Sequence, residues 1–489
     1  MVPDFINLKW LGLHIFSVAF VAAANEVPLS YQEHNCSVDV AVIGAGFSGL
    51  SAARDLLAAG KSVLILEARD RVGGKVLNAN LSNGGITEVG AEFVGPTQDR
   101  VLSLISNLGL ETYNTYNDGD SLLYLNESLS TYNNSAFPDI DAASLLQIGT
   151  AAALLDSMAA GIDVAAPWTH PNASLWDSST FGAWLDVATP LPSARFLLDL
   201  FTTSVFSIEA TEISLLYIIA YIASAGNETT AGTVQSLIDT ANGAQAQRVQ
   251  GGTQLIAIKL AESLGEDKIR FNAPVRSIKN STHGYVVEAD GFWVQAENVV
   301  VAMAPPLAAR IEYVPLLPAS RDQLAQRMPM GSIGKAVAIY DSPFWRENGL
   351  NGQVISDSGT TRATFDNSPS DGSFGALMGF IEADEMILLD GKSEDEVQAA
   401  VLKDFVNYFG PQATNVTEFV LQRWDNEEFS RGAPVAYCPP GVLTRFGPAL
   451  REPVGGIHFA GTETALYWTG YMDGAIRSGE RVAQEILGH

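Results

Sequence analysis

VDVAVIGAGFSGL, residues 38–50, is the stretch that decides the fold of this chain. Its first six residues are apolar apart from Asp39 and rich in valine, as in a strand that is buried on both faces. Glycines follow at 44, 46 and 49, and a helical pattern then places Leu50, Ala53 and Leu57 on one face. A second apolar strand, residues 62–66, ends directly before Glu67. This order predicts the strand–turn–helix–strand unit of a dinucleotide-binding domain.

Each residue type in this unit has a physical reason to be there. Gly44, Gly46 and Gly49 allow a tight turn and let the backbone approach a pyrophosphate, whose charge sits at the helix N-terminus beside Ser48. Glu67 lies 18 residues after the last glycine, where its carboxylate can accept hydrogen bonds from a ribose hydroxyl. The unit predicts a bound dinucleotide without saying which one.

The segments that follow indicate the cofactor. EARDRVGGK, residues 67–75, resembles the second signature of the flavin-containing amine oxidase superfamily, in which Arg69 and Lys75 would lie near the FAD diphosphate. That superfamily usually has Arg where this chain has Lys75, which keeps the charge but loses the bidentate fork. EVGAEFVGPTQ, residues 88–98, resembles the loop that runs beneath the flavin ring.

The C-terminal region extends the resemblance. GIHFAGTE, residues 456–463, and WTGYMDGA, residues 468–475, are similar to the closing segment of monoamine oxidases, whose final helix points its N-terminus at the flavin pyrimidine. NAPV, residues 272–275, resembles the strand that touches the adenine. The glycine loop and the resemblance together give this expected FAD-binding set: Gly44, Gly46, Ser48, Gly49, Glu67, Arg69, Lys75, Ala91, Glu92, Phe93, Val275, Glu463, Tyr471 and Met472.

The resemblance implies an α/β fold with two domains. A discontinuous Rossmann-like FAD-binding domain would comprise residues 37–112, 250–324 and 427–489. An α+β substrate-binding domain would comprise residues 113–249 and 325–426, with the catalytic cavity where the two domains meet.

Within the superfamily, the sequence resembles monoamine oxidase most, and GSIGK, residues 331–335, is similar to that family's run around the active-site lysine. The resemblance implies that Lys335 holds a water beside the flavin, that Gln245 supplies a polar group to the cavity, and that Tyr471 forms one aromatic wall. These three are the expected catalytic residues. The expected substrate cavity adds these neighbours: Phe93, Phe206, Ile238 and Pro434.

Two positions depart from the monoamine oxidase pattern. Pro434 stands where the second aromatic wall is expected, so the cavity should grip small amines less well and admit larger ones, unless Phe206 or Phe93 closes it. Ala433 stands where some relatives attach FAD through cysteine, and Cys438 lies five residues further on. The FAD is therefore expected to be non-covalent.

The expected reaction is oxidative deamination of a primary amine, with dioxygen as the electron acceptor and hydrogen peroxide as a product. A long-chain, sphingoid or fumonisin-like amine is one candidate substrate. L-amino-acid oxidase, polyamine oxidase and the more distant polyene or porphyrinogen desaturases share the cofactor motifs, and a catalytically silent FAD-binding protein would share the fold.

The N-terminus predicts export. Lys9 precedes an apolar stretch at residues 10–24, and Ala22, Ala23 and Ala24 offer a cleavage site, so residues 1–24 are the expected signal peptide; a buried N-terminal helix is the alternative. Eight Asn-x-Ser/Thr sequons support a secreted glycoprotein: Asn35, Asn80, Asn126, Asn133, Asn172, Asn227, Asn280 and Asn415.

Composition limits the partners. The net charge of -27 argues against nucleic acid, which needs a basic face, and suits an acidic, soluble surface. Six scattered histidines and two cysteines give no metal-ligand spacing, so no metal is expected. No membrane anchor is predicted, and the sequence leaves room for a homodimer. Small-molecule amines and dioxygen are the expected partners.

Overall fold

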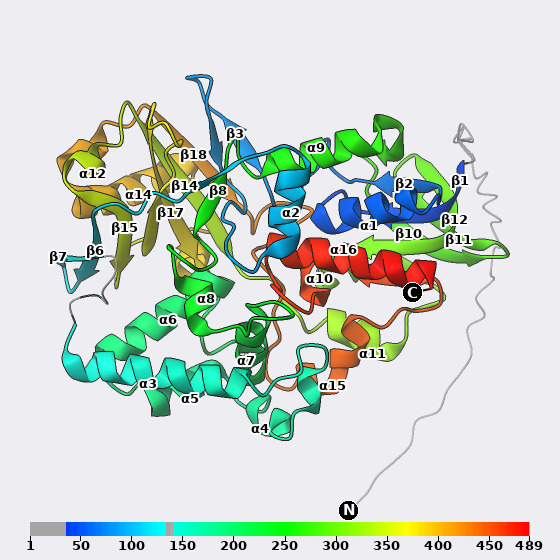
Figure 1. The fold of residues 1–489 in the computed structure, drawn as a ribbon, viewed down its shortest axis with the longest axis horizontal. Helices are drawn as coiled ribbons and strands as arrows, with labels where there is room; N and C mark the ends of the chain where they lie inside the picture. Colours follow the sequence, from blue (N-terminus) through cyan, green and yellow to red (C-terminus); the bar gives the residue numbers. More distant parts are fainter. Residues whose placement is uncertain (1–35, 134–137, 139, 489) are drawn as a thin grey trace, which may run out of the picture. The chain divides into compact units, whose positions relative to one another are not determined.

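The computed structural model describes residues 36–133, 138 and 140–488, and these described residues form one compact unit. The predicted signal peptide, residues 1–24, lies outside the described residues. The chain has a mixed α/β fold with two large sheets, which Figure 1 shows side by side.

The first sheet is built around β1 (Cys36–Ile43). This strand pairs in parallel with β2 (Val63–Leu66) on one side and β12 (Phe292–Ala302) on the other. The strand order is β13-β10-β11-β12-β1-β2-β9, with β19 also paired to β12. The remaining strands are β9 (Ile269–Arg270), β10 (Val275–Ser281), β11 (Gly284–Ala289), β13 (Glu312–Val314) and β19 (Ile457–Ala460). Residues 40–43 are buried, as the unbroken apolar run predicts.

Two helices cover one face of this sheet, namely α1 (Phe47–Ala58) and α16 (Met472–Leu487). They pack closely, because a Cβ on Gly479 would lie only 2.2 Å from the Ser48 carbonyl oxygen. The hydroxyl oxygens of Ser48 and Ser478 are 2.8 Å apart. The first and last motifs of the sequence therefore meet on one side of the sheet. The flanking helices are α2 (Asp99–Asn107) and α9 (Gln254–Leu264).

The second sheet has seven strands in the order β18-β14-β17-β16-β15-β6-β7. Its strands are β6 (Asp120–Leu125), β7 (Ser128–Asn133), β14 (Ile333–Tyr340), β15 (Leu350–Ser356), β16 (Ala363–Asp366), β17 (Gly375–Glu382) and β18 (Glu418–Arg423). The helices α13 (Ala383–Leu388) and α14 (Glu394–Phe409) pack against it. Residues 334–340 of β14 are all buried, with no alternation between buried and exposed positions, because both faces of the strand are covered.

A helical layer lies below this sheet in Figure 1. It contains α3 (Ala142–Ala159), α4 (Ala173–Trp176), α5 (Phe181–Ala188), α6 (Pro192–Phe206), α7 (Leu215–Ser224) and α8 (Val234–Ile238). Among the described residues, α3 alone is long and apolar enough to cross a membrane by length and composition, a test that core helices also pass. It packs against α6 and α7.

The other elements are short connections. They are β3 (Asn78–Asn80), β4 (Ile86–Glu88), β5 (Thr112–Asn114), β8 (Gln247–Val249), α10 (Pro305–Ala308), α11 (Ala319–Ala325), α12 (Phe344–Glu347) and α15 (Leu443–Phe446). The eight-stranded sheet draws all its strands from the segments predicted for the FAD-binding domain, except that β1 starts one residue earlier, at Cys36. The seven-stranded sheet draws its strands from the other set. The domain boundaries themselves stay a prediction.

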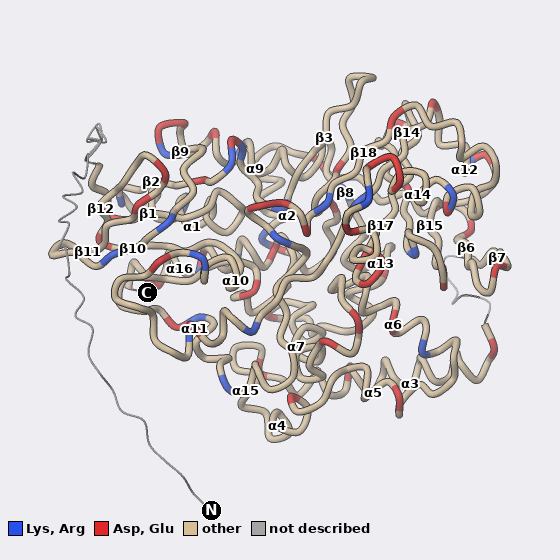
Figure 2. The backbone as a smooth tube through the Cα atoms, turned by 180° about the vertical axis from the view of Figure 1, so that it is seen from behind, with Lys and Arg blue, Asp and Glu red and all other residues tan. Residues whose placement is uncertain are grey.

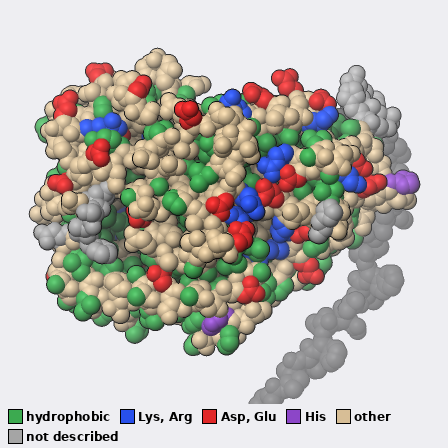
Figure 3. Space-filling view, in the orientation of Figure 1, with side chains coloured by type: hydrophobic (Ala, Val, Ile, Leu, Met, Phe, Trp, Pro, Cys, Tyr) green, Lys and Arg blue, Asp and Glu red, His purple; other side chains and the backbone are tan. Residues whose placement is uncertain are grey.

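Charged side chains are spread over the whole backbone and not gathered on one face. Acidic residues occur along both sheets and the helical layer (Figure 2), and the face shown in Figure 3 mixes both signs with apolar side chains. The excess of Asp and Glu gives the net charge of -27.

Candidate active site

A cavity of about 1050 Å³ runs between the two sheets and the helical layer. One part is lined by the glycine loops and the start of α16, and the other by α3, α6, α8 and strands β15 to β17. It contains most of the residues that the sequence singled out.

The first glycine loop forms one end of the cavity. Gly44 has φ +102°, and a Cβ there would come within 3.0 Å of the Ala302 carbonyl oxygen. A Cβ on Gly46 would meet open space, and Gly46 caps α1 without a side-chain hydrogen bond. The first turn of α1 therefore presents backbone N–H groups toward an open site, which suits a pyrophosphate.

Gly49 does not line this cavity, contrary to the prediction. A Cβ at this position would lie 2.0 Å from the Gly44 carbonyl oxygen. Its lack of a side chain serves the close packing of α1 against the turn, not direct contact with a ligand.

Glu67 is fixed where the ribose is expected. Its buried carboxylate accepts hydrogen bonds from the backbone N–H of Ala45 at 2.7 Å and of Arg69 at 2.9 Å. Arg69 also lines the cavity, and its guanidinium donates to Glu427 and Ser430. Val275, predicted to touch the adenine, lines the same end.

Lys75 joins three separate segments. Its Nζ donates to the Pro434 carbonyl oxygen at 2.5 Å and lies 3.9 Å from Glu463 Oε1. Glu463 Oε1 accepts from the backbone N–H of Ala436 at 3.1 Å. Burial lowers the pKa of Lys75, and the Glu463 carboxylate opposes that shift. Lys75 thus holds the Pro434 segment against the second glycine loop.

The last helix, α16, begins at the cavity. Tyr471 caps it, Met472 is its first residue, and both line the cavity. Asp473 Oδ1 accepts from the backbone N–H groups of Arg100 and Val101, which holds α16 against the start of α2. The partial positive charge at the start of α16 therefore faces the site, where it would stabilise an anionic ring.

Lys335 lies on β14, and the residue is only 2% exposed. Its Nζ donates to the Gly90 carbonyl oxygen at 3.1 Å and lies 2.8 Å from Glu92 Oε2. Burial lowers the pKa of Lys335, and the Glu92 carboxylate opposes this. The Phe380 ring centroid is 5.8 Å from the ammonium. Ala91, Glu92 and Phe93 of the predicted flavin loop all line the cavity beside it.

Gln245 also faces the cavity. Its Nε2 donates to the Leu237 carbonyl oxygen at 3.0 Å, and its Oε1 has no hydrogen-bond partner within the described part of the chain. Nearby Ile238 lines the cavity at the end of α8 and is 47% exposed. Both residues therefore border the same cavity as Tyr471.

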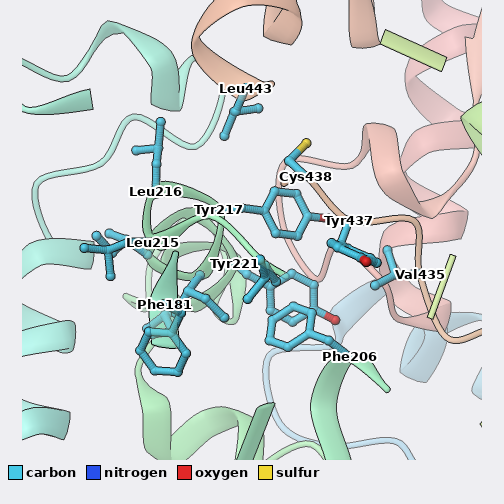
Figure 4. Close-up of a cluster of buried hydrophobic side chains, with 14 of the residues drawn as sticks. Phe181, Phe206, Leu215, Leu216, Tyr217, Tyr221, Val435, Tyr437, Cys438 and Leu443 are labelled. Atoms are coloured by element: carbon cyan, nitrogen blue, oxygen red, sulfur yellow. The ribbon is translucent and has the colours of Figure 1, made fainter. Parts of the chain in front are cut away.

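Phe206 does not line the cavity, which corrects the prediction. It is 1% exposed and lies behind Tyr221, with the two ring centroids 4.5 Å apart (Figure 4). Tyr221, which the sequence reasoning missed, lines the cavity instead, and its ring centroid is 6.2 Å from that of Tyr471. The available signal was the pair of tyrosines, Tyr217 and Tyr221, in the mostly apolar helix α7. Phe365 and Phe380 are further lining rings that were missed.

Comparison with known proteins identifies the chemistry of this site. The family model for flavin containing amine oxidoreductases matches residues 47–487. The chain belongs to this family. It is 40% identical over 450 residues to a Mycobacterium tuberculosis protein described as a flavin-containing monoamine oxidase, covering 92% of this chain and 96% of that one.

The chain is also similar to two further amine oxidases. Amine oxidase B of Sus scrofa is 35% identical over 454 residues, covering 92% of this chain and 86% of the pig protein. The structure of wild-type putrescine oxidase bound to putrescine is 34% identical, with a TM-score of 0.88, covering 93% of this chain and all of that one. The chain is therefore a flavin-dependent amine oxidase that uses FAD.

The residues present fit this cofactor. Gly46 leaves open space at the start of α1, Glu67 is fixed beside the loop, and α16 begins at the same part of the cavity. Bound FAD supplies two-electron redox chemistry. At the same cavity the chain presents the rings of Tyr221 and Tyr471, the buried Lys335 Nζ, which donates to the Gly90 carbonyl oxygen, and a lining of apolar side chains.

The segment around Tyr437 shows where the expected attachment position, Ala433, and the nearby cysteine, Cys438, lie in this amine oxidase. Ala433 and Pro434 both line the cavity. Cys438 is fully buried in the apolar cluster with Tyr217 and does not line the cavity (Figure 4). Burial raises the pKa of the Cys438 thiol, so it is a packing residue and a poor nucleophile.

Proposed function

We propose that this amine oxidase deaminates a bulky or long-chain primary amine outside the cell, giving an aldehyde or ketone, ammonia and hydrogen peroxide. The observation that carries this proposal is the position of Pro434. It lines the cavity where the family places a second aromatic wall, so the amine is held beside one tyrosine wall and an open apolar space.

The two tyrosines at the cavity do not replace the missing wall. The planes of Tyr221 and Tyr471 are tilted by 44°, so they do not form two parallel faces on either side of a small amine. An aromatic contact of this kind is worth about 1 kcal/mol, which weakens the hold on small amines without abolishing it.

The far part of the cavity suits an alkyl chain. Its wall includes these apolar side chains from α3 and α6: Ile148, Ala152, Leu197, Leu198, Leu200, Phe201 and Val205. Burying each methylene of a substrate against such a wall stabilises the complex by about 0.8 kcal/mol. A chain of several methylenes therefore gains more than a single ring contact loses.

The cavity offers less to a substrate that carries a carboxylate, such as an amino acid. Among the described residues that line the cavity from 113–249 and 325–426, Lys335 is the only Lys or Arg, and Glu92 already pairs with it. An amino acid would need a cation of its own to balance its carboxylate.

A diamine is the second candidate. Asp156 and Asp239 line the cavity and could meet a distal ammonium group. Their carboxylates, however, already accept from Val234 N and from Ala241 N and Gln235 Nε2. These hydrogen bonds hold the two carboxylates at the wall but leave their charge, so it is the longer apolar wall of α3 and α6 that favours the monoamine.

A peroxide-coupled screen of purified protein tests the proposal. The panel should contain benzylamine, putrescine, an L-amino acid and a long-chain amino alcohol of sphingoid type. We expect the highest kcat/KM for the long-chain amine. A higher kcat/KM for putrescine would establish the diamine function instead, and a higher value for benzylamine would contradict the proposal.

A further inference from the structure

The ion pair between Glu92 and Lys335 crosses from one half of the molecule to the other. Glu92 belongs to the loop that follows β4, and Lys335 to β14 of the seven-stranded sheet. The Lys335 Nζ and Glu92 Oε2 are 2.8 Å apart, and the residues are 2% and 3% exposed. Both side chains line the cavity where the amine and the cofactor meet.

The Glu92 carboxylate has few partners besides Lys335. Within the described residues, neither of its carboxylate oxygens receives a hydrogen bond of good geometry, so Lys335 is its principal partner. A buried carboxylate with a single cationic partner is a poor device for stability, because desolvation opposes the attraction. Its placement is better explained by what it does to the lysine.

A second buried pair lies next to this one. Arg248 Nη2 is 2.8 Å from Glu88 Oε2, while Glu88 Oε1 accepts from Thr253 N at 2.8 Å. Arg248 Nη1 also donates to the Ser368 carbonyl oxygen, and its guanidinium lies over the Tyr113 ring. Arg248 and Glu88 satisfy each other, which leaves Glu92 as the carboxylate available to Lys335.

We propose that Glu92 is a positioning residue, which holds Lys335 as an ammonium against the Gly90 carbonyl oxygen in front of the FAD site. Burial alone lowers the pKa of Lys335, and would favour a neutral amine there. The Glu92 carboxylate is the largest influence in the opposite direction, followed by Glu88, while Arg248 lowers the lysine pKa further.

The direction of the effect of a variant follows from these charges. Glu92→Gln removes the negative charge nearest to the ammonium and keeps the side-chain size. The pKa of Lys335 then falls further, so the lysine loses its proton at lower pH. This inference concerns the resting enzyme and does not depend on which amine is the substrate.

The test is a pH titration of the visible flavin spectrum of the holoenzyme without substrate. A charge that changes near the ring shifts its absorption bands, so the lysine gives a titration step. In Glu92→Gln we expect the midpoint of this step to fall by at least one pH unit, about a tenfold change in the acid dissociation constant. Glu92→Asp should restore part of the shift, and Lys335→Met should remove the step.

Glu288→Gln is the matched control, because it removes a carboxylate from an exposed ion pair with Lys279. Its titration should coincide with that of the wild type. An unchanged midpoint in Glu92→Gln would overturn the proposal. Loss of FAD from Glu92→Gln at wild-type fold stability would also overturn it, because Glu92 would then act in cofactor binding.

Discussion

The Tyr221 ring lies beside the Tyr471 ring, with the centroids 6.2 Å apart and the planes tilted by 44°. Tyr221 comes from the buried helix α7 and Tyr471 from the cap of α16, so the two halves of the chain each contribute one ring. Phe206 and Trp468 pack behind this pair. The ring centroids of Phe206 and Tyr221 are 4.5 Å apart, and those of Trp468 and Tyr471 are 4.9 Å apart. The positions of the two tyrosine rings at the cavity therefore depend on packing in two layers.

Replacing Tyr221 tests its role in the cavity. Tyr221→Leu removes the ring and keeps an apolar side chain, so we expect kcat/KM for benzylamine to fall about fivefold, which corresponds to about 1 kcal/mol of ring contact. Long-chain amines should lose less, because the far wall holds them. Phe206→Leu is the control from the layer behind; equal losses of benzylamine activity in both variants would show that Tyr221 acts only through packing.

Lys335→Met should affect both chemistry and stability. We expect FAD content to stay near the wild-type value while flavin reduction, reoxidation or both slow at least tenfold, because the fixed ammonium is gone. Stopped-flow absorbance separates the two half-reactions. Wild-type rates for both would contradict the catalytic role.

The stability of Lys335→Met should depend on pH. Burial raises the pKa of Glu92, and without Lys335 its ionised form has no partner. The folded variant then keeps the Glu92 proton to higher pH than the unfolded chain. Its stability deficit should be small below the ordinary glutamate pKa and should grow as the pH rises, toward about 3 kcal/mol. Thermal unfolding at pH 5 and pH 8 measures this deficit. Combining Lys335→Met with Glu92→Gln should remove the part of the pH dependence that Lys335→Met introduced.

The cavity positions before Tyr437 predict how FAD is held. Ala433 lacks the sulfur of the attaching cysteine, and the fully buried Cys438 does not line the cavity. Acid precipitation should therefore release all the yellow colour into the supernatant, from the wild type and from Cys438→Ser alike. Flavin that stays on the precipitated wild-type chain would show a covalent link.

If the protein is exported, the exposure of each sequon predicts which asparagines carry glycans. Asn80, Asn126, Asn172, Asn280 and Asn415 are exposed and open to modification. Asn227 differs, because its Nδ2 donates to Asp99 at 2.8 Å and its Oδ1 accepts from Thr229 and Thr230. We expect secreted protein that begins near Asn25, with glycans at exposed sequons and none at Asn227. Peptide mapping after deglycosylation measures this; an extracellular chain that retains Met1 would contradict export.

Local sequence predicted some of the site well and some poorly. Gly44, Gly46 and Glu67 form one short unit, so neighbours in the chain determine their positions. The choice between Phe206 and Tyr221 depends on how α6 and α7 rotate against each other, which the spacing of apolar residues does not determine. The pairing of Glu92 with Lys335 depends on how the second sheet meets the flavin loop. Both features arise from tertiary packing between distant segments.

The rate of anaerobic flavin reduction tests the substrate proposal most directly. Wild type and Pro434→Tyr should each be mixed with benzylamine and with a long-chain amino alcohol, and the bleaching of the flavin followed. We expect the wild type to be reduced more efficiently by the long-chain amine. Pro434→Tyr should shift the ratio of the two rates at least fivefold toward benzylamine, consistent with about 1 kcal/mol for a regained ring contact. An unchanged ratio would show that Pro434 does not set the size of the substrate.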